Sequence, residues 1–201
     1  MNKDKFWEII ERTKDINSEI MHSNLTKEIE ILSKKEILMF RSYINGYIEL
    51  VDQSIWVYMA CKVINGYVSD DTGLYFSLWL ISQGETILLK TLNDPDSISE
   101  LPEIPFGNAE YEMLMGIGFE EDEENLEEMD EELLESKDWG VMVIRSVHKN
   151  IIQEIIPTIK YKNGKKYGDY ESFEDGMEDI KNILPKLIKR AEKEQFDWKK
   201  W

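Results

Sequence analysis

The sequence predicts a mainly α fold, a compact multi-helix domain that spans residues 1–201. Three observations predict it. Apolar residues recur three or four positions apart over most of the chain. With 42% hydrophobic and 11% aromatic residues the chain can bury a core, and 201 residues is the size of one domain. Helix-ending signals such as Asn65-Gly66 and Pro185 divide the pattern into segments.

The first third of the chain predicts short helices followed by a long one. Residues 4–14 place apolar side chains at helical spacing, and a second short helix is expected to start near Asn24 or Thr26. Ser33 and Glu36 then form an S-x-x-E capping box, which begins the longest periodic segment.

That periodic segment runs from Ile37 to Val63, and its interpretation stays open. It is either one long helix or two helices broken near Asn45-Gly46 or Asp52-Gln53. Gly66 is expected to end it in the left-handed conformation.

The middle of the chain alternates helices and turns. We expect a helix from about Thr72 to Gln83 with Gly84 as its C-cap, and another over residues 85–94. Residues 94–108 hold three of the five prolines and read as turns and extended chain. Residues 110–116 are a further helix candidate.

Residues 119–137 form an acidic insert or linker within the domain. The sequence carries eleven acids between Glu120 and Glu135, so the segment is either a solvated helix or a flexible insert. It lacks the glycine and the D-x-D-x-D-G order of a calcium loop. As a partner-binding block it offers Glu120, Glu121, Asp122, Glu123, Glu124, Glu127, Glu128, Asp130, Glu131 and Glu132.

The last third of the chain combines an ambiguous apolar segment with a helical tail. Residues 140–157 are predicted to form a buried helix or a strand followed by a helix, and helix is favoured. Asn163-Gly164 suits a two-residue turn and leaves open a small β-hairpin near residues 159–168. The tail is helical from about Ser172, and Pro185 either kinks it or begins a second helix.

Charge and composition narrow the classes of function. A net charge of -17 argues against binding nucleic acid or anionic lipid and fits a basic protein partner. The chain shows no apolar run long enough to cross a membrane and no secretion signal. Its single cysteine, Cys61, fits a reducing compartment, so we expect a cytoplasmic location. The oligomeric state stays open.

Asp70 and Asp71, side by side before an aromatic run, are the strongest chemical candidates. They are either an acid pair or the start of a helix, whose free amides one aspartate would cap. Adjacent side chains diverge, whereas catalytic carboxylates usually converge from different elements, so the structural interpretation is favoured. Trp56, Tyr75 and Trp79 would line a ligand pocket beside them, although core packing is the stronger interpretation.

The sequence offers little other chemistry. His22 and His148 have no partner at metal-ligand spacing, and zinc motifs, phosphate-binding loops and nucleophile motifs are missing. We therefore expect no metal site, no cofactor and no catalytic residue, and a non-enzymatic role is favoured.

The stretch WVYMACKVINGYVSDDTGLYFSLWLISQG resembles an uncharacterised bacterial family, the domain of unknown function numbered 4240. The F-W near the start, the D-P-D at residues 94–96 and the acidic F-E-D tail resemble it too. Asn65 stands where the family pattern has glycine, and Ser77 where it has arginine. The resemblance implies a compact, mainly helical fold and brings no established reaction. The matching central positions are Trp56, Ile64, Gly66, Ser69, Asp70, Asp71, Tyr75, Phe76, Trp79, Leu80, Ile81 and Gly84.

These observations favour an acidic protein-interaction module. Its most concrete form is a neutralising partner, an immunity or inhibitor protein, of a basic toxin or nuclease. The alternative is a hydrolase or small-ligand-binding protein that uses Asp70, Asp71 and the adjacent aromatics. A helical scaffold whose acidity only aids solubility is the third hypothesis.

Overall fold

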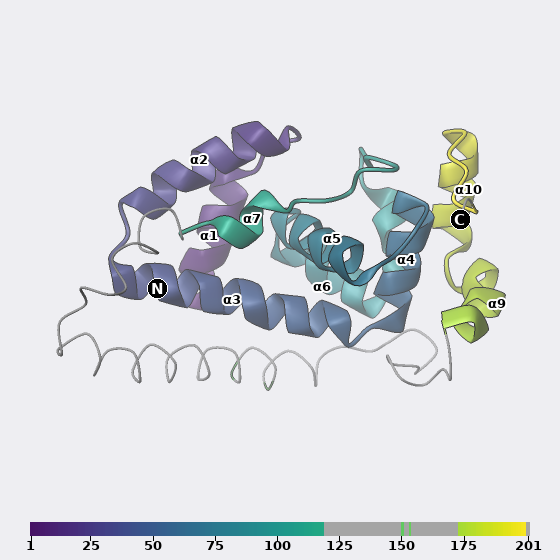
Figure 1. Cartoon of the computed structure of the whole chain (residues 1–201), viewed down its shortest axis with the longest axis horizontal. Coiled ribbons are helices and arrows are strands. Elements are labelled where there is room, and N and C mark those ends of the chain that lie inside the picture. Colours follow the sequence, from purple (N-terminus) through teal and green to yellow (C-terminus); the bar gives the residue numbers. More distant parts are fainter. Residues whose placement is uncertain (119–149, 151–152, 154–172, 200–201) are drawn as a thin grey trace.

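The computed structural model describes residues 1–118, 150, 153 and 173–199, and within them it is built from helices (Figure 1). The predicted mainly α fold is confirmed, with no strand in the described ranges. The acidic block and the segment considered for a hairpin, residues 159–168, lie outside them. The named elements are α1 Lys3–Thr13, α2 Ser18–Glu30, α3 Lys34–Asp52, α4 Ile55–Asn65, α5 Asp70–Ser82, α6 Glu85–Asn93, the 3-10 helix η1 Pro95–Glu100, α7 Met113–Gly116, α9 Phe173–Ile183 and α10 Pro185–Lys193.

Helices α4 and α5 form the centre of the molecule (Figure 1). All residues of α4 except Tyr58 are buried, and α5 is buried continuously from Phe76 to Ser82. A helix that is apolar on every side must be covered on every side. Helices α3 and α6 pack against α5, while α9, α10 and η1 cover α4. None of the helices in the described ranges is long and apolar enough to cross a membrane.

Helix α2 begins at Ser18, so the predicted start near Asn24 or Thr26 is wrong. The side chain of Asn17 accepts hydrogen bonds from the backbone N–H groups of Glu19 at 2.9 Å and Ile20 at 3.1 Å. An asparagine cap satisfies two amides that have no partner within the helix. The Asn17 cap therefore starts α2 before the regularly spaced apolar residues on which the prediction was based.

The long periodic segment breaks after Asp52, which settles the alternatives left open by the sequence. Gly46 is buried within α3 and does not interrupt it. Ser54 starts α4 by accepting a hydrogen bond from the N–H of Val57. The predicted capping box is confirmed, because Ser33 and Glu36 each accept a hydrogen bond from the other's backbone N–H.

Asp52, at the C-terminal end of α3, makes the stability of the fold depend on pH. Burial raises its pKa above the ordinary 3.8, opposed by a hydrogen bond from the Tyr58 hydroxyl and assisted by the charge of Glu49. The folded state therefore binds this proton more tightly than the unfolded state, and the charged carboxylate costs stability above the raised pKa.

We expect Asp52→Asn to be more stable than the natural chain at pH 7, because the amide removes the charge and still accepts from Tyr58. The advantage should shrink as the pH falls through the raised pKa of Asp52 and disappear below 3.8. Urea unfolding of both proteins at pH 7 and pH 3.5 measures it. An equal advantage at both pH values would contradict the assignment.

The C-terminal helices are attached to η1 by a buried acid. Pro185 begins a second helix, α10, and Asp96 accepts hydrogen bonds from the N–H groups of Lys186 at 3.0 Å and Leu187 at 2.9 Å. Arg190, one turn further along α10, donates to the carbonyl oxygens of Ser99, Leu101 and Pro102. These contacts join residues about ninety positions apart, and they close the core over α4.

Candidate functional site

The two aspartates lie in the first turn of α5, and neither one caps it. The cap is Ser69, whose hydroxyl oxygen accepts a hydrogen bond from the N–H of Thr72 at 3.2 Å. The helix therefore begins at Asp70, and the expectations that it begins at Thr72 and that an aspartate caps it are wrong. Both aspartates are exposed. Their charge is favourable beside the positive end of the helix, but their carboxylates remain open to solvent.

A second segment, the strap (residues 107–112), runs beside the start of α5. Its Gly107 N–H donates to the carbonyl of Ile64 at 2.8 Å. The amide of Asn65 pairs with both backbone groups of Ala109, accepting from its N–H at 2.8 Å and donating to its carbonyl at 3.4 Å. The Asn65 side chain thus pairs with the strap in the way that the N–H and C=O groups of another backbone segment would. Asn65 therefore has a structural role in this chain.

Two tyrosines join the strap to the start of α5. The hydroxyl of Tyr67 donates to Glu110 Oε1 at 3.4 Å, and that of Tyr75 donates to Glu112 Oε1 at 3.0 Å. A further bond runs from the N–H of Tyr111, between the two glutamates, to the Tyr75 carbonyl at 3.1 Å. We call Tyr67, Asp70, Asp71, Tyr75, Glu110 and Glu112 the acidic rim.

Three rim carboxylates raise the pKa of Tyr75. Its pKa is raised, first by the hydrogen bond to Glu112, then by burial, and further by the charges of Glu112, Asp71 and Glu110. Negative charge beside a phenol disfavours its ionised form. Carboxylates from α5 and from the strap therefore act on one phenol.

No cation pairs with Asp70, Asp71, Glu110 or Glu112 among the residues that the structure describes. Acids elsewhere do have such partners: Glu36 contacts Lys5 at 2.7 Å, for example. Like charges gathered without a counter-charge repel one another. The rim is thus a concentration of negative charge that the described part of the fold leaves uncompensated.

The rim carboxylates are not arranged as a metal site. Within the described ranges, no three histidine, cysteine or acidic side chains are placed to hold a metal ion together. The rim instead offers carboxylates from α5 and from the strap around Tyr67 and Tyr75. That chemistry suits the recognition of cationic groups from outside.

Two of the three aromatic residues proposed to line a ligand pocket are buried in the core. Trp56 is 1% exposed and Trp79 is 7% exposed, and both belong to the core. Tyr75 is half-buried, with its hydroxyl bonded within the rim. Core packing accounts for the two tryptophans, so Tyr75 is the one member of this group that lies in the rim.

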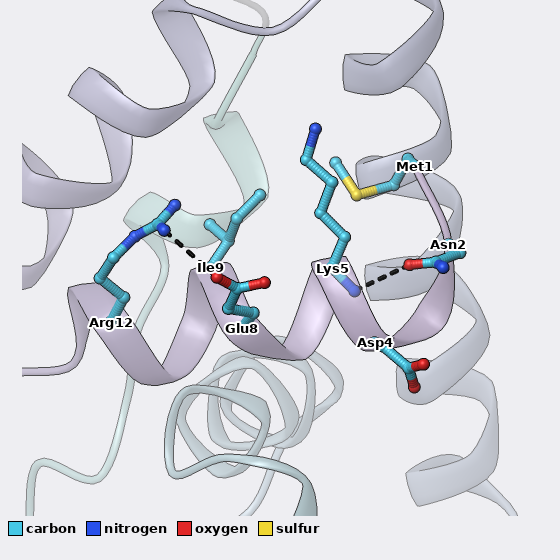
Figure 2. Close-up of a pocket in the computed structure, with 7 residues that line it drawn as sticks. All are labelled: Met1, Asn2, Asp4, Lys5, Glu8, Ile9 and Arg12. Atoms are coloured by element: carbon cyan, nitrogen blue, oxygen red, sulfur yellow. Dashed lines mark hydrogen bonds and ion pairs between the residues drawn. The ribbon is translucent and has the colours of Figure 1, made fainter.

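An open hollow of about 550 Å³ lies elsewhere, along α1 (Figure 2). Three of its charged side chains have partners: Lys5 donates to Glu36 at 2.7 Å, and Arg12 contacts Glu8 at 3.5 Å and also Glu28. Figure 2 shows the Arg12–Glu8 pair along the wall of the hollow. Cations and anions alternate there, so the hollow favours no ligand of one charge.

Reasoning from the sequence selected Asp70, Asp71 and Tyr75 but missed Tyr67, Glu110 and Glu112. The missed contacts join residues 37 and 43 positions apart, and no local pattern encodes them. The acidic block lies outside the described residues.

Comparison with known proteins adds a family but no chemistry. The family model described as "Protein of unknown function (DUF4240)" matches residues 1–133, which include the whole rim. The resemblance seen in the tail lies beyond the matched residues. No curated protein and no solved structure matches the chain.

Proposed function

We propose that this chain, which belongs to the DUF4240 family, is a non-enzymatic acidic module that binds a basic protein. The observation that carries the proposal is the acidic rim, where Asp71, Glu110 and Glu112 act on Tyr75 next to the exposed Asp70 and no cation pairs with these acids among the described residues. Like charges that gather in this way repel one another. A cationic partner supplies the missing counter-charge.

The distribution of charge along the chain supports the same proposal. From Val63 to Ser136 the sequence carries twenty acids and a single base, Lys90. This range includes the rim and the acidic block of residues 120–132. Such a field attracts a basic protein from a distance and speeds its association, and salt screens that attraction.

The most concrete form of the proposal is a neutralising partner, an immunity or inhibitor protein, of a basic toxin or nuclease. Enzymes that act on nucleic acid carry basic clefts for the phosphates. An acidic module blocks such a cleft by offering carboxylates in place of the phosphates. This form agrees with the net charge of -17, which disfavours nucleic acid as the chain's own ligand.

Affinity capture from the native cytosol tests the proposal. At low salt the natural chain should retain a basic protein that elutes as the salt concentration rises. The rim variant Asp70→Asn/Asp71→Asn/Glu110→Gln/Glu112→Gln should lose that protein.

The matched control removes four exposed acids outside the rim, Glu19→Gln/Glu30→Gln/Glu103→Gln/Glu192→Gln, with the same change in net charge. This control variant should retain the basic protein. Recovery of no basic protein at low salt would overturn the proposal. Equal losses in the two variants would show that net charge alone, and not the rim, determines capture.

A further inference from the structure

We propose that the acidic rim selects arginine over lysine in its partner. This inference rests on the proposed function and names the cationic group that the rim recognises. Its basis is that the rim combines carboxylates with the exposed ring of Tyr67, and that exposed methionines follow it along the chain. A compact ammonium ion needs only the carboxylates, whereas a planar guanidinium ion uses both kinds of group.

Tyr67 supplies the aromatic surface. Its side chain is 48% exposed, and its hydroxyl is held by Glu110 at 3.4 Å. The ring therefore lies open to solvent with a carboxylate at its hydroxyl edge. A guanidinium ion that stacks on such a ring can donate two parallel N–H bonds to a carboxylate beside it. Only one oxygen of Glu110 is engaged by Tyr67.

The strap continues from the rim into exposed apolar side chains. Met113, directly after Glu112, is 37% exposed, and Met115 is 47% exposed. With Tyr67 they account for three of the six large hydrophobic side chains that the described residues expose. Methionine and tyrosine are enriched at protein interfaces, and apolar surface beside a carboxylate accommodates the methylene stem of an arginine. The exposed methionines that follow the rim along the chain and the negative charge of the rim together favour an arginine-bearing segment as its occupant.

Two peptides of equal charge separate arginine recognition from general attraction. We expect the natural chain to bind a nonaarginine peptide about fivefold more tightly than a nonalysine peptide in calorimetry at 150 mM salt. Tyr67→Leu should bring the two dissociation constants close together. Tyr67→Phe, which keeps the ring, should preserve the preference. Thermal unfolding of each variant confirms that it is folded.

The outcomes distinguish the inference from the function on which it rests. Equal affinities of the natural chain for the two peptides would overturn the arginine preference, and so would an unchanged preference in Tyr67→Leu. If the rim variant still weakened the binding of both peptides more than the control variant did, the acidic module would stand. Equal binding of both peptides by the rim variant and the control variant would overturn both proposals.

Discussion

Replacement of Asp96 with alanine is expected to lower the free energy of unfolding by about 3 kcal/mol. This carboxylate is 1% exposed and accepts backbone hydrogen bonds from Lys186 and Leu187, at the start of α10. Alanine leaves those N–H groups without an acceptor in a buried place, where an unsatisfied group costs free energy. The substitution also removes the hydrogen bonds that attach α10 to η1.

Asp96→Asn is the matched control, because the amide oxygen still accepts one hydrogen bond. We expect a loss of about 1 kcal/mol, since a neutral acceptor is weaker than a charged one. Urea unfolding followed by circular dichroism measures both changes. An alanine variant within 0.5 kcal/mol of the natural chain, taken as about the scatter of surface substitutions, would contradict this account of how α10 docks.

Replacement of Asn65 with alanine is the second large change, with an expected loss of about 2 kcal/mol. The Asn65 side chain is 4% exposed and exchanges two hydrogen bonds with the backbone of Ala109. Without it, the Ala109 N–H has no acceptor and the strap loses its central attachment. Because the strap carries Glu110 and Glu112, the affinity for a cationic peptide should fall as well.

The same substitution at an exposed position is the control for Asn65→Ala. Asn45 lies exposed within α3, where alanine has the higher helix propensity, so Asn45→Ala should be neutral or slightly stabilising. Unfolding in urea and titration with nonaarginine give both readouts. A loss of stability in Asn65→Ala without any change in peptide affinity would show that the strap does not position the rim.

Local chemistry allowed much of the fold to be predicted from the sequence. The capping box of Ser33 and Glu36, the left-handed Gly66 and the helix start at Pro185 all depend on residues a few positions apart. The start of α2 was misplaced because Asn17 precedes a stretch with few apolar residues. In that stretch the capping residue, and not the spacing of apolar residues, indicates where the helix begins.

The candidate site was only partly predictable, for a physical reason. Asp70 and Asp71 stand out as adjacent acids before an aromatic run. Their partners in the rim come from the strap, about forty positions later, and pairing at that distance depends on the packing of the core. Asp96 is a similar case, because the acidic side chain and the amides it caps are ninety positions apart. Nothing local marks it as a helix cap.

The central claim is that the negative charge of the rim carboxylates serves to bind a partner and is not needed for the stability of the fold. The most direct test is the double variant Glu110→Gln/Glu112→Gln, since glutamine still accepts from Tyr67 and Tyr75 while the charge is removed. The account predicts an unfolding free energy at least equal to that of the natural chain, because repulsion with Asp71 is relieved, together with weaker binding of nonaarginine. A loss of more than about 1 kcal/mol in stability with unchanged peptide affinity would contradict it.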